Sequence, residues 1–409
     1  MSIKMFVKSV LGKSRHGAGA VKRRLRRAFV DCRAGILLKS FEKKRNADRK
    51  IRVGFLAQMP EVWDKEKPVY EAMMNDDAFE PVLIVVPNRN IVTDQFEELA
   101  SDNYFLTNYA EAVPARKNDS WMDLKELYLD YLFYPRCYEN YLPKQYHTYN
   151  TVRFTRPCYI PYCYHVLAEP KGYYSTSFFS NTYRMFCCSQ DALERVPAKF
   201  KKRSVFLGYP SLESIGGASY DSSHPTILWM PRWTEDMQYG GTTFYAYKDK
   251  VLGLKQSSSE LILRPHPLMF QNAIKSERMT PDEIDAYKER VKKSGALFDS
   301  NELIEDTFDN TDILITDLSS AIISYFLSEK PIIYCTKTDI GFVGVFSDII
   351  ECSYLAEDWD DVVRFVRNLT DGVDPLKEKR EAVARKYREV QGRSAVKIAS
   401  FIKEDFFRA

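Results

Sequence analysis

The sequence lacks the signatures of several protein classes. Its 409 residues contain none of the motifs H-E-x-x-H, G-x-S-x-G or G-x-G-x-x-G, which argues against a zinc protease, an α/β-hydrolase and a dinucleotide oxidoreductase. The eight cysteines include no C-x-x-C pair, so they lack the ligand spacing of a structural zinc site. No apolar run approaches the roughly 18 residues that cross a bilayer, and charges interrupt the opening segment MSIKMFVKSVLGKSRHG. We therefore expect a chain that neither spans a membrane nor is exported.

The composition is that of an ordinary folded protein. Hydrophobic residues make up 45% of the chain and charged residues 28%. At roughly 100 to 200 residues per domain, this length predicts two domains. Most cysteines lie in apolar or aromatic runs, such as the one around Cys158, which is typical of buried free thiols in a reducing cytosol.

Charge is divided unevenly along the chain. The formal net charge is +3, yet residues 1–50 contain 16 Lys and Arg against 3 Asp and Glu, so the rest of the chain is acidic. Apolar residues recur at helical spacing between Val21 and Phe41, which predicts a basic amphipathic helix. Such helices bind anionic membrane surfaces, and we expect residues 1–45 to do so; a solvated tail is the alternative. We expect no nucleic-acid partner, because no nucleic-acid-binding fold follows.

Strands and helices alternate in both halves of the remaining chain, which predicts an α/β protein with parallel, doubly wound sheets. We expect a basic segment at 1–49, a Rossmann-like domain at 50–212, a linker at 213–225 and a second Rossmann-like domain at 226–409. Two such domains that face a cleft are typical of the GT-B fold of nucleotide-dependent transferases. The predicted strands are 50–57, 81–87, 131–134, 158–162, 226–230, 260–264, 312–316 and 331–334, and the clearest helices are 67–75, 281–293, 319–328, 382–387 and 394–402.

The end of the predicted strand 312–316 is suited to phosphate binding. There Asp317, Ser319 and Ser320 open a helix, so hydroxyls, backbone N–H groups and the positive end of the helix dipole meet at the carboxyl edge of the sheet. The alternative is that these side chains only cap the helix, as such residues do at many helix starts.

Two histidines follow other predicted strands. His266 lies between two prolines beside Arg264, whose guanidinium suits phosphate. Its imidazole can donate a hydrogen bond to a leaving phosphate or act as a general acid. His165 follows the strand 158–162 into the same cleft, where it can deprotonate a hydroxyl. A structural role is the alternative, beside a loop for His266 and in an aromatic patch for His165.

Several segments together resemble the CDP-glycerol glycerophosphotransferases, a family that builds teichoic acid and related capsular polymers in bacteria. The resemblance covers most of residues 50–402, and the order and spacing of the segments make it specific. The segments are KIRVGFL, VWDKEKPVYEAM, YPRCYENYLPKQY, CYIPY, ILWMPRW, LRPHPL, DILITDLSS and GRSAVKI.

The resemblance implies a GT-B fold in which the C-terminal domain holds CDP-glycerol and the N-terminal domain faces the acceptor. Family members transfer glycerol phosphate to a hydroxyl of a polymer or a lipid-linked primer and release CMP, and no cofactor is required. The resemblance makes His165 and His266 the catalytic residues. The expected donor-binding residues are Arg232, Arg264, Asp317, Ser319 and Ser320.

The same resemblance predicts the partners and the location. We expect a nucleotide-activated polyol as donor, a lipid-linked or polymeric acceptor, no metal ion, and a peripheral position at the cytoplasmic face of the bacterial cell membrane. A homo-oligomer is one of the assembly states that the sequence leaves open.

One segment departs from the family pattern. Members carry W-H-G-T-P-x-K around their N-terminal histidine, whereas His165 is followed by Val-Leu-Ala-Glu-Pro-Lys. A subfamily with another donor or acceptor would explain this departure, and CDP-ribitol or a nucleotide sugar is therefore an alternative donor. A non-catalytic subunit of a capsule complex is the alternative outside the enzymes.

Overall fold

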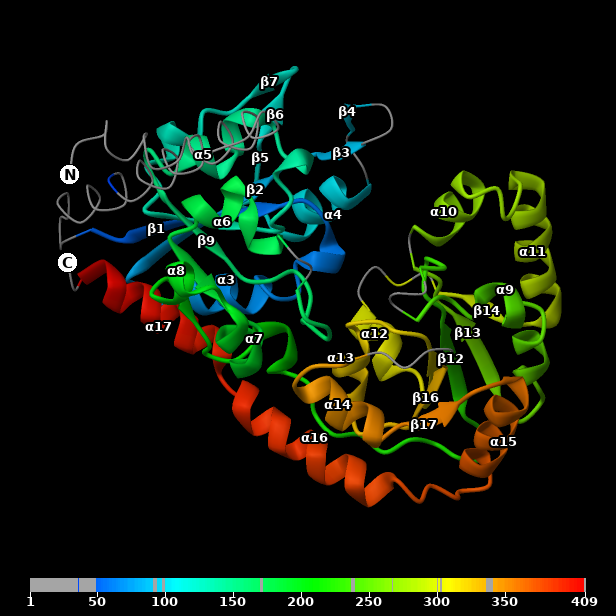
Figure 1. Cartoon of the computed structure of the whole chain (residues 1–409). Coiled ribbons are helices and arrows are strands. Elements are labelled where there is room, and N and C mark those ends of the chain that lie inside the picture. The colour runs from blue at the N-terminus through cyan, green and yellow to red at the C-terminus, as the bar shows by residue number, and fades with distance from the viewer. Residues whose placement is uncertain are drawn as a thin grey trace, which may run out of the picture.

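The computed structural model describes Ile36 and residues 49–90, 94–97, 100–169, 172–236, 240–266, 268–299, 301, 304–335 and 341–407 (Figure 1). The amphipathic helix predicted between Val21 and Phe41 lies outside the described residues, apart from Ile36. Among the described residues, no helix is both long and apolar enough to cross a membrane. The seven cysteines within this part of the chain are all free, and six of them are buried.

The first half of the chain forms a seven-stranded parallel sheet in the order β11-β10-β9-β8-β1-β2-β5. Its inner strand β1 is buried almost throughout, as expected for a strand covered on both faces. A Cβ atom at Gly54 would lie only 2.7 Å from Leu129 Cδ1, so glycine permits the close packing over this strand. The strands are β1 (Ile51–Ala57), β2 (Phe79–Val85), β5 (Val113–Pro114), β8 (Tyr131–Tyr134), β9 (Arg156–Tyr159), β10 (Arg184–Phe186) and β11 (Ser204–Val205).

The second half forms a six-stranded parallel sheet in the order β14-β13-β12-β15-β16-β17. The chain leaves β12 toward one side of the sheet and returns through β15 to the other, so a topological switch point lies between these two strands. The strands are β12 (Thr226–Met230), β13 (Glu260–Leu263), β14 (Leu297–Phe298), β15 (Ile313–Thr316), β16 (Ile332–Cys335) and β17 (Tyr354–Ala356). The predicted α/β class with parallel, doubly wound sheets is thus confirmed.

Helices connect the strands, and two small antiparallel ribbons lie outside the sheets. The ribbons are β3 (Asn88–Asn90) with β4 (Gln95–Glu97) and β6 (Arg116–Lys117) with β7 (Ser120–Trp121). The helices of the first half are α3 (Lys67–Met74), α4 (Ala100–Asn108), α5 (Thr148–Thr151), α6 (Ser177–Asn181), α7 (Gln190–Arg195) and α8 (Ala198–Lys201). Those of the second half are α9 (Phe244–Tyr247), α10 (Met269–Lys275), α11 (Pro281–Ser294), α12 (Ile304–Asp309), α13 (Ile322–Leu327), α14 (Val345–Glu351), α15 (Trp359–Thr370), α16 (Lys377–Gln391) and α17 (Ser394–Phe407).

Helix α11 shows how the local sequence sets the bounds of an element. Thr280 and Glu283 form a capping box, Pro281 occupies the first turn, and Gly295 ends the helix with φ 81°. Each of these residues is favoured at its position, because the cap bonds satisfy free backbone groups and glycine adopts a left-handed conformation without strain. The predicted helix 281–293 therefore ends within one residue of the observed one.

The last helix returns to the first half of the molecule. Helices α16 and α17 run from the second sheet back toward the first, and α17 packs against α3 (Figure 1). In α17, Asp405 accepts hydrogen bonds from the hydroxyls of Tyr131 and Tyr183, both at 2.8 Å, and from Arg184 at 2.5 Å. The predicted second domain spans 226–409, yet its last helix α17 packs on α3 of the first half and buries apolar residues such as Ile402 in a core cluster that includes residues of both sheets.

Candidate active site

The predicted site residues all follow the carboxyl end of a parallel strand. The segment after β12 carries Arg232, and the segment after β15 carries Asp317, Ser319 and Ser320, so these segments flank the switch point of the second sheet. Open α/β sheets bind ligands at this position. The segment after β13 carries Arg264 and His266, and in the first sheet His165 lies in the segment that follows β9 (Arg156–Tyr159).

Asp317 lies beneath the segment that follows β12. Its side chain is buried, with 2% of the residue exposed, and both carboxylate oxygens accept hydrogen bonds. The donors are the backbone N–H of Arg232 at 2.9 Å, the backbone N–H of Thr243 at 3.0 Å and the Thr243 hydroxyl at 2.7 Å. Burial raises the pKa of Asp317, although these bonds act in the opposite direction. Asp317 therefore holds the backbone at Arg232 and Thr243. Its direct contact with a donor substrate stays a prediction.

His266 and Arg232 lie in each other's electrostatic field. Desolvation and, second, the positive charge of Arg232 lower the pKa of His266 to about 4. The imidazole Nδ1 accepts a hydrogen bond from the backbone N–H of Leu268 at 3.1 Å, so the proton of the neutral ring is on Nε2. The ring of Trp233 lies 5.6 Å away, centroid to centroid, at an angle of 31°. His266 is therefore a neutral hydrogen-bond donor at physiological pH.

The two serines after β15 lie in a turn before the helix. The Ser319 hydroxyl accepts a hydrogen bond from the backbone N–H of Ala321 at 3.2 Å, and both serines are half-buried. Helix α13 begins at Ile322, three residues later than predicted, because residues 319–321 form this turn. The Ser319 contact belongs to this turn and is not a helix cap, because Ala321 is the N-cap of α13 and no side chain caps the helix. The predicted phosphate contact of Ser319 and Ser320 stays a prediction.

Arg264 has several protein partners. Its guanidinium forms an ion pair with the buried Asp299, and it also donates to the Asn301 carbonyl at 2.9 Å and to the Thr307 hydroxyl at 3.1 Å. These contacts join the segments that follow β13 and β14 to helix α12. The structure thus gives Arg264 protein partners that the sequence did not suggest, and its expected contact with phosphate stays a prediction.

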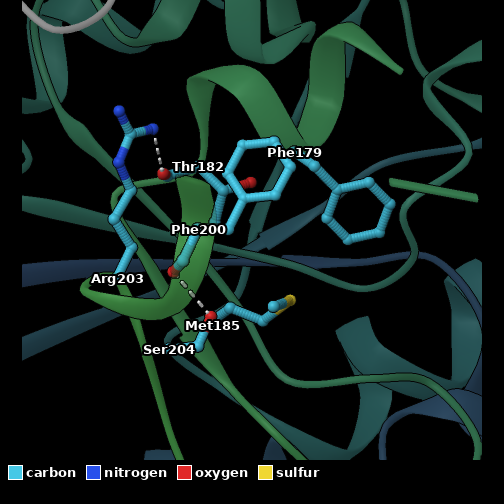
Figure 2. A pocket seen from close by; sticks show the side chains of 6 residues that line it. All are labelled: Phe179, Thr182, Met185, Phe200, Arg203 and Ser204. Atoms are coloured by element: carbon cyan, nitrogen blue, oxygen red, sulfur yellow. Dashed lines mark hydrogen bonds between the residues drawn. The ribbon is translucent and has the colours of Figure 1, made fainter. Parts of the chain in front are cut away.

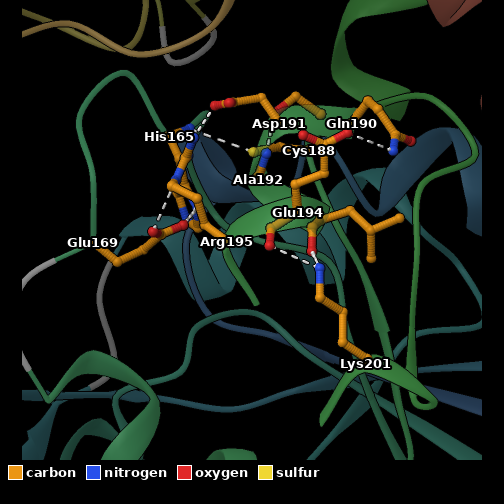
Figure 3. Close-up of polar contacts among 11 residues, drawn as sticks. His165, Glu169, Cys188, Gln190, Asp191, Ala192, Glu194, Arg195 and Lys201 are labelled. Carbon is orange, nitrogen blue, oxygen red and sulfur yellow. Dashed lines mark hydrogen bonds and ion pairs between the residues drawn. The ribbon is translucent and has the colours of Figure 1, made fainter. Parts of the chain in front are cut away.

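His165 lies where the two halves of the chain meet. The neighbouring carbonyl of Val166 accepts a hydrogen bond from the backbone N–H of Val343, which precedes α14 of the second half. The imidazole Nδ1 lies 3.0 Å from Glu169 Oε1, and Glu169 in turn contacts Arg195 of α7 (Figure 3). Glu169 and Arg195 are not among the site residues predicted from the sequence. The available signal was a carboxylate four residues after His165. This spacing predicts a contact only within a helix, and residues 165–169 do not form one.

A second group of residues missed by the sequence analysis follows β1. Lys65 and Glu66 are completely buried, and neither carboxylate oxygen of Glu66 has a hydrogen-bond partner. Burial raises the pKa of Glu66 to about 7. The polar run Asp-Lys-Glu-Lys, which begins at Asp64 in the segment between a buried strand and the next helix, was the available signal. Within the described part of the chain, no cluster of His, Cys, Asp and Glu could hold a metal ion.

Glu305 of α12 lies in the electrostatic field of Asp64, which belongs to the first half of the chain. Burial and, second, the charge of Asp64 raise the pKa of Glu305 to about 7. Burial also raises the pKa of Asp64. Two acidic groups from different halves therefore lie near each other beside the segments that carry the predicted site residues.

A small pocket lies elsewhere, at the outer edge of the first sheet (Figure 2). The Arg203 guanidinium donates to the Thr182 carbonyl at 3.3 Å, and the Ser204 hydroxyl donates to the Phe200 carbonyl at 3.0 Å. None of the predicted site residues lines this pocket. Its lining residues are Phe179, Thr182, Met185, Phe200, Arg203 and Ser204.

The raised pKa of Glu305 predicts a pH-dependent stability. The unfolded carboxyl group loses its proton near pH 4.5 and the folded one near pH 7, so this group lowers the free energy of unfolding as pH rises between these values. Glu305→Gln removes this loss. From pH 5 to pH 8, the free energy of unfolding of Glu305→Gln should therefore rise by about 2 kcal/mol relative to wild type, after allowance for solvent screening.

Urea denaturation at the two pH values measures this difference. Asp309→Asn, at an exposed position of the same helix, is the matched control and should differ from wild type equally at both pH values. Equal differences between Glu305→Gln and wild type at both pH values would contradict the prediction.

Comparison with known proteins finds a family match for part of the chain. Residues 212–404 match the family model described as CDP-glycerol:poly(glycerophosphate) glycerophosphotransferase. No curated protein sequence matches the chain. The matched span contains Arg232, Arg264, His266, Asp317, Ser319 and Ser320.

Solved structures share the fold. A variant of the wall teichoic acid polymerase TagF, in which asparagine replaces a histidine, has a TM-score of 0.54 at 14% identity, over 94% of this chain and 98% of TagF. The same variant with CDPG has a TM-score of 0.53 at 13% identity over the same shares. A UDP-N-acetylglucosamine 2-epimerase has a TM-score of 0.52 at 11% identity, over 88% of this chain and 97% of its own. At such low identities the likeness shows the fold alone, and it confirms the predicted GT-B fold.

The family match and the fold agree with the resemblance that the sequence segments carry. Over residues 212–404, slightly less than half of its length, the chain is similar to the CDP-glycerol:poly(glycerophosphate) glycerophosphotransferases.

Proposed function

We propose that the protein transfers glycerol phosphate from CDP-glycerol to a hydroxyl group of a lipid-linked or polymeric acceptor and releases CMP. The product belongs to a teichoic-acid-like or capsular polysaccharide. The observation that carries this proposal is the family match over residues 212–404, together with the position of Arg232 and His266 at the carboxyl edge of the second sheet. No resident cofactor takes part in the proposed reaction.

The charge state of His266 supports a role toward the diphosphate of the donor. Because its Nδ1 accepts the Leu268 N–H, its Nε2–H is available to donate to a phosphate oxygen. The guanidinium of Arg232 supplies positive charge at the same place. Fixed donors and charges of this kind stabilise the negative charge that builds up on a leaving phosphate.

The proposed step is an in-line displacement at phosphorus. The acceptor oxygen attacks the phosphorus that carries glycerol, while the hydroxyl proton passes to His165. A new P–O bond forms, and the bond between this phosphorus and the bridging oxygen of CMP breaks. CMP leaves with the bonding electron pair, and no oxidant or reductant is needed. Positioning and electrostatic stabilisation supply most of the rate acceleration in such transfers.

Release of CMP from CDP-glycerol tests this proposal. With a lipid-linked or short glycerol-phosphate primer, we expect primer-dependent release by wild-type protein, and kcat lower by about 100-fold or more in His165→Ala and in His266→Ala. His224→Ala is the matched control, since His224 is exposed and precedes β12 at the opposite end of the strand, and it should keep wild-type turnover.

Other outcomes would contradict parts of the proposal. Release of CMP from CDP-ribitol alone, or of another nucleotide from a nucleotide sugar alone, would overturn the choice of donor. Binding of CDP without turnover across all donors and primers would indicate a non-catalytic subunit. Wild-type turnover in His266→Ala would remove that residue from the mechanism.

We also propose that the protein acts as a peripheral protein at the cytoplasmic face of the bacterial membrane, with residues 1–45 on anionic lipid. The excess of basic residues in this segment supports the proposal, since each Lys or Arg near such a surface contributes about 1 kcal/mol. The full chain should sediment with vesicles that contain anionic lipid and remain in solution with neutral vesicles. Equal sedimentation with both would contradict the proposal.

A further inference from the structure

The imidazole of His165 is held by a carboxylate from its own segment. His165 Nδ1 lies 3.0 Å from Glu169 Oε1, and the two side chains are only 12% and 9% exposed (Figure 3). The segment between them has no regular secondary structure. A helical turn therefore does not bring these two residues together, and their contact is a property of this particular segment.

Glu169 is in turn held by helix α7. Its second oxygen accepts a hydrogen bond from Arg195 Nε at 3.1 Å, and Arg195 also forms an ion pair with Asp191 (Figure 3). Burial alone would raise the pKa of Glu169, but the hydrogen bonds from His165, its own backbone and Arg195 lower this pKa to about 2. The carboxylate is therefore ionised throughout the physiological range.

An ionised carboxylate has no proton to donate, so the proton in the contact belongs to His165 Nδ1. In a neutral imidazole, Nε2 then carries the free lone pair and can accept a proton. This distribution is opposite to that in His266, whose Nδ1 accepts the Leu268 N–H. The contacts thus determine which nitrogen of each histidine can donate and which can accept.

The other contacts of His165 fix the position of its ring and backbone. The backbone N–H of His165 donates to Cys188 Sγ at 3.4 Å, and the ring of Tyr173 packs edge-on at 5.8 Å. The titratable groups that contact His165 are thus Glu169, Tyr173 and Cys188. The carboxylate of Glu169 links Arg195 to His165. The contacts with Glu169 and Tyr173 hold the imidazole ring in one orientation.

The same group of residues contacts the second half of the chain. A Cβ atom at Gly344, which precedes α14, would lie 3.0 Å from Asp191 Oδ2. The Val166 carbonyl, next to His165, accepts the Val343 N–H at 3.3 Å. His165 and its supporting residues therefore lie at the junction of the two halves, where the acceptor and the donor would meet.

We propose that Glu169 is a positioning residue for His165, held in place by Arg195, and that it keeps the proton on Nδ1 so that Nε2 receives the proton of the acceptor hydroxyl. This inference rests on the proposed transfer, in which that hydroxyl attacks phosphorus. It also gives a role to the segment Val-Leu-Ala-Glu-Pro-Lys, where the sequence departs from the pattern of the family that it resembles.

The tautomer of His165 can be measured without any activity. The chain contains five histidines, so ¹⁵N-histidine labelling gives an NMR spectrum that can be assigned with His165→Gln. At pH 8 we expect the Nδ1–H tautomer for His165 in wild-type protein, and a mixture of tautomers in Glu169→Ala. A wild-type His165 with its proton on Nε2, or an unchanged spectrum in Glu169→Ala, would overturn the inference even if the protein transfers glycerol phosphate.

The pH profile of the transfer separates positioning from a merely structural role. In Glu169→Gln we expect kcat to fall by about 100-fold with KM for the donor unchanged. The acid limb of kcat/KM should move to lower pH by about one unit, because the imidazolium has lost its neighbouring negative charge. Glu169→Asp, which restores the charge, should recover the position of the acid limb.

The matched control is Glu194→Gln, an exposed glutamate of α7 next to Arg195, which should keep wild-type kinetics. A fall in kcat with an unmoved acid limb would overturn the inference in favour of a structural role. If Glu169→Gln does not fold, Arg195→Lys tests the same contact, since it loses the Nε donor, and it should lower kcat about 10-fold. Wild-type kinetics in Arg195→Lys would then contradict the role given to Arg195.

Discussion

The buried carboxylate of Asp317 connects the segments that follow β12 and β15. Its oxygens accept hydrogen bonds from the backbone N–H of Arg232 and from the backbone N–H and hydroxyl of Thr243, so Arg232 and Thr243 are held at one point. A buried carboxylate is stable only when donors of this kind surround it. Asp317 thus holds the backbone at Arg232, whose charge is the second cause of the lowered pKa of His266, and next to Trp233, whose ring lies 5.6 Å from that of His266.

The two predicted catalytic histidines differ in a way that suits a transfer reaction. His266 has a backbone donor on Nδ1, which leaves Nε2–H as a donor toward the leaving phosphate. His165 has a carboxylate on Nδ1, which leaves Nε2 as an acceptor toward the attacking hydroxyl. One ring thus supplies a proton donor and the other a proton acceptor. Neighbouring groups, and not the histidines themselves, produce this division of roles.

Much of the fold could be predicted because central parallel strands are buried on both faces and read as apolar runs. The predicted strands 131–134 and 226–230 coincide with β8 and β12. The edge strands β14 and β17 were missed, since two or three residues give no recognisable run. The return of α17 to the first sheet depends on contacts such as that between Asp405 and Tyr131, 274 residues apart, which no local pattern contains.

The candidate site was predictable as a set of positions but not as a set of contacts. Polar residues after buried strands identified His266, Asp317 and Arg264, because the topology brings these ends to one edge. Which groups bind each other depends on partners that are distant in the sequence. The partner of Asp317 lies 74 residues away and that of Arg264 lies 35 residues away. Only the three-dimensional structure distinguishes a supporting carboxylate from a ligand-binding one.

The proposed diphosphate site at Arg232 and His266 depends on Asp317, which holds the backbone of Arg232, and the affinity for CDP tests this dependence most directly. Calorimetric titration of Asp317→Asn should show CDP binding at least about tenfold weaker than wild type, since the amide presents N–H groups to backbone donors. Asp312→Asn is the control, because Asp312 accepts the backbone N–H groups of Asp221 and Thr226 near the opposite end of β15 and should leave the affinity unchanged. Equal loss of affinity in both variants, or none in Asp317→Asn, would contradict the account.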